Sequence, residues 1–231
     1  MANKPKSAEI HPGPGFRIRK TITRPDSAIL EQFRQFPTPD ISDLLNRLYT
    51  MTMEIKNLTN DLPIVGSACT VKVYPGDNLM VHKALDVVRP GDVIVVDAGG
   101  RPPAVWGELA TQSCLQRKLA GVVVDGAVRD TGEIAALGFP CFARQVASAC
   151  GEPKGHGEIG ATLRIEGIEI HTGDWIVGDD DGLLVLPRAQ AAEMANRAMD
   201  CLERENRIRG EIRAGRTTLG QVLELLRWEK R

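Results

Sequence analysis

An arginine and an aspartate stand side by side at positions 129 and 130. An arginine presents a fork of N–H donors that can bind a carboxylate through two hydrogen bonds, and an aspartate presents hard oxygen ligands suited to a divalent metal. Arg129 could therefore hold a small 2-oxo acid, while Asp130 holds a metal ion. The same pair could instead form a surface salt bridge with Asp130 capping a helix, and the spacing alone favours that simpler interpretation.

A second segment, Gly107-Glu108-Leu109-Ala110, could complete such a site. It lies in the first half of a helix that the pattern predicts from Ala104 to Lys118. If the helix begins at this segment instead, the free backbone N–H groups of its first turn form an anion site. Two turns would then face one pocket, which raises the weight of the functional interpretation.

Two buried strands are expected to position these segments. The apolar runs Val93–Asp97 and Val122–Asp125 are typical of strands in a parallel sheet, and the helix between them completes a β-α-β unit. Open α/β sheets bind ligands outside the carboxyl ends of their strands. Arg129 and Asp130 follow the second run and so fall at that edge.

The other expected elements divide the chain into an N-terminal arm and one α/β domain. Residues 1–25, rich in proline and polar side chains, are the arm, and residues 26–231 are the domain. Short apolar pieces between 161 and 186 predict an antiparallel β-meander. Thr218, with Gln221 three residues later, predicts a capping box. Further strands are expected at 63–74 and 141–144, and helices at 27–36, 39–49, 78–88, 130–137, 188–213 and from 218 onward.

Composition narrows the classes of function. The chain of 231 residues has 29 basic and 30 acidic side chains, so no net charge draws it to nucleic acid or to a membrane surface. Its five cysteines include no C-x-x-C pair, which argues against a disulfide framework or a structural zinc site. No apolar run is long enough for a membrane span. We expect a cytoplasmic protein that acts on a small molecule.

Three motifs match known sites only in part. The G-x-G-x-x-G at 155–160 precedes a strand-like pattern where a dinucleotide site needs a helix. His156 and Glu158 form an H-x-E, but no P-C-x-x-C follows to complete a deaminase zinc site. The run 179–182 lacks the spacing of a calcium loop and predicts a turn before a buried strand. The histidines show no metal-binding spacing, and His82 is the one expected near the proposed site.

Four strings carry a resemblance to a known family. W-G-E-L-A-T at 106–111, V-V-D-G-A-V-R-D at 123–130, G-F-P at 138–140 and G-D-D-D-G at 178–182 resemble the 4-hydroxy-4-methyl-2-oxoglutarate aldolase family. That family is similar in sequence and fold to the regulator of ribonuclease activity A, RraA. The resemblance covers most of residues 40 to 215. It implies an RraA-like layered α/β/β domain with a central sheet, resembling the phosphohistidine swivelling domain.

The resemblance also implies an activity. Members are class II aldolases that use Mg²⁺ or Mn²⁺ to cleave 4-hydroxy-4-methyl-2-oxoglutarate or 4-carboxy-4-hydroxy-2-oxoadipate to pyruvate and a second oxo acid, usually with oxaloacetate decarboxylation as a side activity. Carried onto this chain, Asp130 binds the metal and Arg129 holds the pyruvyl oxygens. The segment 107–110 cradles the carboxylate. A metal and an arginine can stabilise the pyruvate enolate that cleavage leaves.

Two glutamates are further candidates. Glu108 stands where such aldolases often have aspartate, in a role that handles the proton of the C4 hydroxyl through water. Glu205 aligns with a glutamate that reaches the site from a neighbouring subunit, which implies a homotrimer or homohexamer. The alternative is a non-catalytic RraA-like regulator that binds a ribonuclease. Asp130 argues against it, because that regulator lacks the aspartate after the arginine.

Overall fold

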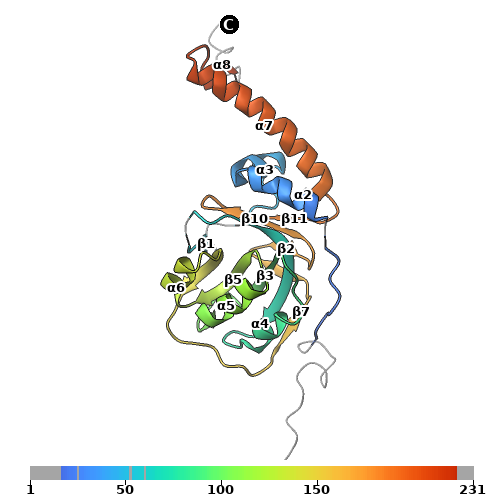
Figure 1. The fold of residues 1–231 in the computed structure, drawn as a ribbon, viewed down its shortest axis with the longest axis vertical. Helices are drawn as coiled ribbons and strands as arrows, with labels where there is room; N and C mark the ends of the chain where they lie inside the picture. The colour runs from blue at the N-terminus through green and yellow to red at the C-terminus, as the bar shows by residue number, and fades with distance from the viewer. Residues whose placement is uncertain (1–16, 25, 52–53, 60, 223–231) are drawn as a thin grey trace, which may run out of the picture.

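The chain folds around a nine-stranded mixed sheet in the computed structural model, which describes residues 17–24, 26–51, 54–59 and 61–222 (Figure 1). The order is β1-β6-β5-β3-β2-β10-β11, with β4 beside β5 and β7 beside β2. The strands of this sheet are β1 (Lys56–Asn57), β2 (Ile64–Val73), β3 (Asp92–Asp97), β4 (Ala104–Trp106), β5 (Gly121–Val128), β6 (Cys141–Val146), β7 (Gly157–Ile159), β10 (Trp175–Asp179) and β11 (Gly182–Leu186).

The centre of the sheet confirms the predicted β-α-β order. Strands β2, β3, β5 and β6 run parallel to one another, with Val95 opposite Thr70 on one side and Val123 on the other. Most of their residues are buried on both faces, which is why they form continuous apolar runs in the sequence. Their carboxyl ends therefore meet at one edge of the sheet.

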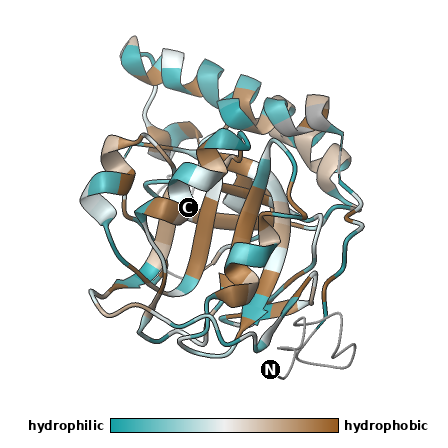
Figure 2. Ribbon diagram, turned by 60° about the horizontal axis from the view of Figure 1, so that its bottom comes forward, coloured by the Kyte–Doolittle hydropathy of each residue, from teal (hydrophilic) through white to brown (hydrophobic). Residues whose placement is uncertain are grey.

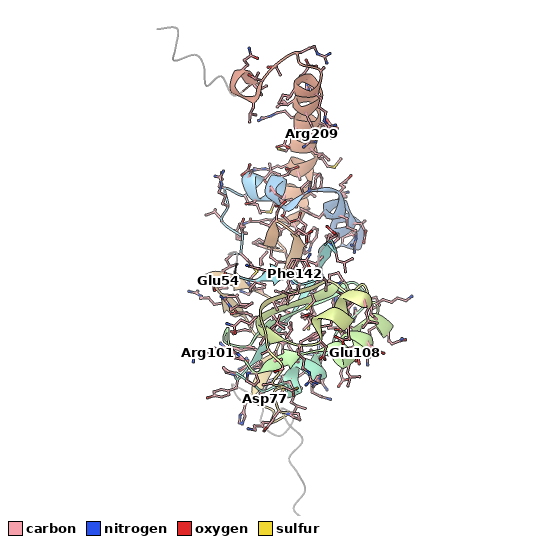
Figure 3. The ribbon with its side chains drawn as sticks, turned by 90° about the vertical axis from the view of Figure 1, so that its left-hand side faces the viewer. Glu54, Asp77, Arg101, Glu108, Phe142 and Arg209 are labelled. Carbon is pink, nitrogen blue, oxygen red and sulfur yellow. The ribbon has the colours of Figure 1, made fainter. Side chains whose placement is uncertain are left out.

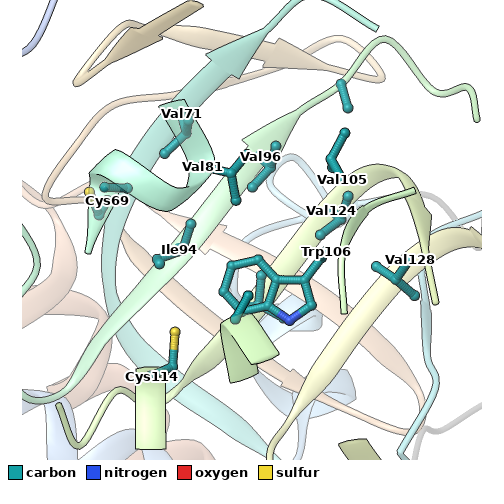
Figure 4. Packing of buried hydrophobic residues seen from close by; sticks show 14 of the residues in the cluster. Cys69, Val71, Val81, Ile94, Val96, Val105, Trp106, Cys114, Val124 and Val128 are labelled. Carbon is teal, nitrogen blue, oxygen red and sulfur yellow. The ribbon is translucent and has the colours of Figure 1, made fainter. Parts of the chain in front are cut away.

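Helices cover part of each face. They are α2 (Ser27–Gln32), η1 (Phe33–Gln35), α3 (Thr38–Leu44), α4 (Leu79–Ala84), α5 (Glu108–Gln116), α6 (Thr131–Ala136), α7 (Ala191–Arg213) and α8 (Leu219–Val222). Figure 2 shows the apolar strands behind helices of mixed polarity. One buried cluster lies between the sheet and α4, α5 and α6, and includes Trp106 packed near Val124 and Val128 (Figure 4). A separate cluster joins α2, α3 and α7 to β10 and β11.

Three predicted helices differ from those observed. The helix predicted from Ala104 is wrong at its start, because Ala104 and Trp106 pair with β5 as strand β4 and the helix begins only at Glu108. The helix expected to reach Tyr49 ends at Leu44, where Asn46 and Arg47 take a left-handed backbone with φ of 51° and 64°. The helix expected at 78–88 covers only Leu79–Ala84.

The predicted meander is two separate hairpins. Strands β8 (Leu163–Ile165) and β9 (Ile168–Ile170) form a two-stranded sheet of their own, whereas β10 joins the main sheet antiparallel to β2. The turn at 179–182 lies between β10 and β11, as predicted. The Asp179 carboxylate accepts a 2.9 Å hydrogen bond from the backbone N–H of Thr38, so it caps α3 from outside that helix.

Two motifs have structural roles. The residues of the G-x-G-x-x-G include strand β7, which pairs with β2, and Ile18 of the N-terminal segment lies beside Ile159 in a parallel bridge. The capping box is confirmed: the N–H of Thr218 donates to Gln221 Oε1 at 2.9 Å, and the N–H of Gln221 donates to Thr218 Oγ1 at 3.3 Å. Within the described ranges, no helix combines the length and apolarity needed to cross a bilayer.

Candidate functional site at the carboxyl edge of the sheet

An irregularity in strand β5 places Arg129 and Asp130. The pairing of β5 with β6 shifts register between Val124 and Ala127, and β4 pairs with the part of β5 beyond the shift. Gly126 lies at this point, where an added Cβ would come within 2.8 Å of the Ala98 side chain. Such bulges redirect a strand and are common beside active sites. The strand therefore continues past its predicted end at Asp125, and Arg129 follows it directly.

Asp130 is the N-cap residue of α6, but its side chain does not cap that helix and its ion pair with Arg129 is loose. It takes a left-handed backbone (φ 58°, ψ 37°), an unfavourable conformation for a residue with a side chain, and makes no capping bond to α6. The Arg129 Nε to Asp130 Oδ2 distance is 3.5 Å, with both side chains more than a third exposed. The alternative of a surface salt bridge with a helix cap is therefore right about the position of Asp130 at the start of α6, but the capping bond is absent and the ion pair is weak.

The carboxylate of Asp130 instead faces the first turn of α5. The backbone N–H of Glu108 donates to Asp130 Oδ2 at 3.1 Å, and the N–H of Arg129 donates to the Trp106 carbonyl at 3.0 Å. A Cβ on Gly107 would lie 2.7 Å from Asp130 Oδ2 and 3.2 Å from Arg129 Cγ. The two predicted segments are thus in contact, and the close approach requires glycine at 107.

Internal hydrogen bonds fix the start of α5. The indole Nε1 of Trp106 donates to Thr111 Oγ1 at 2.9 Å, and that hydroxyl donates to the Gly107 carbonyl at 3.2 Å. Trp106 is 3% exposed and Thr111 is fully buried, so the network is anchored in the core. This explains the W-G-E-L-A-T string. Its first residue, Trp106, and its last, Thr111, fix the backbone between them, which carries the free N–H groups of a helix start.

A small hollow of about 130 Å³ lies at this junction. All six residues predicted from segment 107–110 and the Arg129-Asp130 pair line it. His82, which the sequence placed near the site, lines it too, whereas sequence reasoning missed Asn78 and Cys150. Partial desolvation by the atoms packed around it lowers the pKa of His82 and favours the neutral imidazole, although the residue has an exposed surface. The lining residues are Asn78, His82, Val105, Trp106, Gly107, Glu108, Leu109, Ala110, Arg129, Asp130 and Cys150.

The two predicted glutamates occupy different places. Glu108 begins α5 at the hollow, and its carboxylate accepts a hydrogen bond from Gln112 one turn later. Glu205 lies on α7, the long helix that extends away from the sheet (Figure 1). Its Oε2 lies 3.7 Å from Nη2 of Arg209, one turn later. In Figure 3, Arg209 and Glu108 stand at widely separated levels of the molecule. One chain therefore does not bring Glu205 to the other predicted residues.

A second charged group lies on the other face of the same edge. Arg144 Nε donates to Asp125 Oδ1 at 2.6 Å and Arg144 Nη2 donates to Glu166 Oε1 at 2.5 Å, while its third nitrogen contacts Glu54. Burial, together with Asp97 and Glu166 nearby, raises the pKa of Asp125 to about 6. This cluster has used its donors within the protein.

A wider hollow of about 780 Å³ adjoins strand β7. Its charged lining includes Arg17, Arg19, Lys72, Asp97 and Glu158, and none of the predicted site residues contributes to it. Lys72 Nζ lies 3.7 Å from Asp97 Oδ2. Volume alone therefore does not identify the site that the sequence predicts.

Comparison with known proteins identifies the family of the chain. A family model described as RraA-like, Aldolase/RraA, matches residues 38–185. A protein of Halalkalibacterium halodurans, provisionally named 4-hydroxy-4-methyl-2-oxoglutarate aldolase, is 39% identical over 199 residues, covering 84% of this chain and 95% of that protein. A Thermus thermophilus protein named 4-hydroxy-4-methyl-2-oxoglutarate aldolase is 34% identical, covering 65% of this chain and 92% of that protein.

Solved structures agree on the fold. An uncharacterized protein from Pseudomonas syringae superimposes with a TM-score of 0.77 at 29% identity, covering 89% of this chain and 97% of that one. A structure titled as the RNA-processing inhibitor RraA from Thermus thermophilus gives a TM-score of 0.62 at 32% identity, covering 66% of this chain and 93% of that one. The mixed α/β fold is thus RraA-like.

Proposed function

The chain belongs to the RraA-like family, and we propose that it is a lyase of that family, a divalent-metal-dependent aldolase. Its substrate is a 4-hydroxy-2-oxo acid of the 4-hydroxy-4-methyl-2-oxoglutarate type, cleaved to pyruvate and a second oxo acid. One observation carries the proposal: the Asp130 carboxylate, on a left-handed backbone, faces the start of α5 beside the Arg129 guanidinium. The names of two aldolase relatives support the same reaction.

The donor set suits magnesium or manganese. Asp130 Oδ2 accepts one hydrogen bond, while Oδ1 accepts none from the described residues, so one oxygen is available as a ligand. Among the described residues no group of three His, Cys, Asp or Glu side chains could hold a metal. Mg²⁺ commonly uses one or two carboxylates and keeps several waters, which fits Asp130 and does not suit a zinc-type cage. A bound ion would supply positive charge to the oxygen of the developing enolate.

Arg129 and the start of α5 would hold the pyruvyl half of the substrate. The Arg129 side chain is 39% exposed and its guanidinium is bound only loosely to Asp130, so its donors can turn to the oxygens of a 2-oxo acid. The backbone N–H groups of the first turn of α5 would receive the carboxylate. Both groups also stabilise the negative charge that grows on the pyruvate fragment as the bond breaks.

Cleavage requires one proton to leave and one to return. The C4 hydroxyl loses its proton, the C3–C4 bond breaks, and its electron pair forms the enolate of pyruvate, which is then protonated at C3. Glu108 is the carboxylate that lines the hollow besides Asp130, and we assign it proton handling through water. Oxaloacetate decarboxylation forms the same enolate, and we propose it as a side activity.

A ribonuclease regulator is the competing function. The solved RraA neighbour from Thermus thermophilus is titled an RNA-processing inhibitor, while a relative from the same organism is named an aldolase. The contacts of Asp130 favour the enzyme, because a binding protein has no need of a carboxylate held at a helix start by an unfavourable backbone conformation.

We also propose that the protein is a homotrimer or homohexamer. Leu109 beside the hollow is 76% exposed, and α7 extends away from the sheet beyond the cluster that it forms with α2 and α3. A neighbouring subunit would cover these surfaces and bring Glu205 to the site. Light scattering should give the mass of three or six chains, and a monomeric mass would refute this assembly.

A coupled assay of pyruvate release tests the activity. Purified protein with Mg²⁺ should release pyruvate from 4-hydroxy-4-methyl-2-oxoglutarate and, more slowly, from oxaloacetate. EDTA should abolish both activities, and added Mg²⁺ or Mn²⁺ should restore them. Turnover that survives EDTA would refute the metal, and no release from any 4-hydroxy-2-oxo acid would leave the regulator as the better function.

A further inference from the structure

Two polar side chains of one helix face form the wall of the hollow opposite the predicted pair. Asn78 immediately precedes α4, and His82 lies one turn later, so both project to the same side. Both line the hollow together with Arg129 and Asp130. None of the motifs in the sequence includes either residue.

Asn78 carries an unsatisfied acceptor. Its side chain is 7% exposed, and its Nδ2 donates to the carbonyl of Gly151 at 3.3 Å, which fixes the orientation of the amide. Its Oδ1 is buried and accepts no hydrogen bond from any residue that the structure describes. A buried carbonyl oxygen without a donor is costly, so the site lacks a hydrogen-bond donor that a ligand could supply.

His82 offers the complementary group. The structure describes no hydrogen bond or ion pair to its imidazole, and its backbone N–H bonds the Asn78 carbonyl at 3.1 Å within the helix turn. Its neutral imidazole has one N–H that can donate to an anion. The carboxylate of Asp130 and the guanidinium of Arg129 are the charged groups across the hollow, together with Glu108 at its rim.

We propose that Asn78 and His82 are specificity-determining residues that recognise the distal half of a 4-hydroxy-2-oxo acid. Asn78 Oδ1 accepts a hydrogen bond from the C4 hydroxyl as the substrate binds and so orients it, before that hydroxyl gives its proton to the water beside Glu108. The His82 imidazole donates a hydrogen bond to the carboxylate carried on C4. This inference rests on the proposed function, because Arg129 and the start of α5 must first hold the pyruvyl half.

These two contacts should matter for cleavage of a 4-hydroxy-2-oxo acid and not for decarboxylation of oxaloacetate at the same site. Oxaloacetate has no C4 hydroxyl and no carboxylate beyond C4, so its decarboxylation does not use either contact. A site that hydrogen-bonds a substrate hydroxyl loses discrimination when that contact is removed. Substitutions at Asn78 and His82 should therefore change the ratio of the two activities, which a merely structural role would not do.

The test compares kcat/KM for both substrates in Asn78→Ala, His82→Ala and wild type, each with saturating Mg²⁺. Cleavage of 4-hydroxy-4-methyl-2-oxoglutarate should fall about fivefold in Asn78→Ala and about tenfold or more in His82→Ala, where the lost bond is to a charged group. Oxaloacetate decarboxylation should stay within about twofold. His82→Gln keeps a donor and should recover part of the loss.

Lys83→Ala is the matched control. Lys83 follows His82 on the same helix, is exposed and pairs with Asp86 away from the hollow, so this substitution should leave both activities unchanged. Equal losses of both activities in the variants, or no loss of cleavage, would overturn the inference while leaving the aldolase intact. No pyruvate from either substrate with wild type would overturn the proposed function and the inference with it. His82 is exposed, so its variants remain informative if Asn78→Ala fails to fold.

Discussion

Two arginine–carboxylate groups lie at the end of strand β5, and they differ in how completely their charges are matched. Arg144 meets Asp125 and Glu166 at 2.6 and 2.5 Å, and these three side chains are 11 to 14% exposed. Arg129 and Asp130 approach only to 3.5 Å and are 39% and 37% exposed. The first group is satisfied inside the protein, and the second retains donors and an acceptor for a ligand.

The difference lies in backbone position and not in residue type. Asp125 lies at the start of the register shift and still pairs with Asp97 of β3, and its side chain is covered by other residues, including Arg144 from β6. Asp130 comes after the register shift, on a left-handed residue held against the start of α5. A buried ion pair mainly maintains structure, whereas an exposed and loosely bound pair can exchange its partner for substrate or metal.

Removing the arginine of the open pair should have the largest effect. Arg129→Ala should lower kcat/KM for pyruvate release by about 100- to 1000-fold, because it removes donors to the developing enolate. Arg129→Lys should recover little, since an ammonium lacks the planar fork. Thermal unfolding should be almost unchanged. A variant that unfolds much earlier than wild type would show that Arg129 is structural, as Arg144 is.

Removing the arginine of the closed group should act on stability instead. Arg144→Ala removes the arginine that Asp125 and Glu166 share in a mostly buried place, so urea unfolding should show a loss of about 3 kcal/mol. Activity per folded molecule should change little. Arg101→Ala, at an exposed arginine, is the control and should stay within about 0.5 kcal/mol of wild type. An Arg144→Ala variant as stable as wild type would contradict the contrast between the two arginine–carboxylate groups.

Crowding the open pair should have an intermediate effect. Gly107→Ala places a methyl 2.7 Å from Asp130 Oδ2, so the carboxylate must move, and activity should fall about tenfold with little change in stability. Gly132→Ala is the matched control: no atom lies within 4 Å of an added Cβ at this position in α6, and alanine there should stabilise by about 0.5 to 1 kcal/mol. Full activity in Gly107→Ala would remove the need for this close approach.

The smallest effect is the pH dependence of the closed group. The pKa of Asp125 is raised from 3.8 to about 6, first by burial and then by Asp97 and Glu166. Between about pH 4 and 6 the folded protein keeps a proton that the unfolded chain releases, so this carboxyl favours folding at low pH and its contribution is lost as the pH rises to 6. The free energy of unfolding should change between pH 4 and 7 by about 1 to 2 kcal/mol less in Asp125→Asn than in wild type. If the variant and wild type show the same pH dependence of unfolding, the raised pKa of Asp125 is contradicted.

The sequence predicted the parallel strands because burial on both faces produces continuous apolar runs. Val93–Asp97 and Val122–Asp125 needed no further information. It failed at Ala104–Trp106, where a short strand pairs with residues beyond the bulge of β5, a partner that local pattern does not reveal. The meander failed for the same reason, since β10 pairs with β2, about 110 residues earlier in the chain.

The site was predicted in part. Arg129, Asp130 and segment 107–110 stood out because their types and positions after strands suggest ligand binding, and the structure brings them into contact. Asn78 and His82 carry no such signal, since a lone asparagine and a lone histidine are common in any fold. Their role depends on α4 packing beside α5, which only the assembled structure reveals.

Binding of Mn²⁺ followed by electron paramagnetic resonance, with and without pyruvate, tests the central claim most directly. Wild type should bind Mn²⁺, and pyruvate should tighten that binding, because Asp130 and Arg129 hold the metal and the oxo acid side by side. Asp130→Ala should lose the signal of bound ion, while Glu166→Gln, at the closed group, should keep it. Binding that survives in Asp130→Ala but is lost in Glu166→Gln would place the metal in the other cluster and contradict the account.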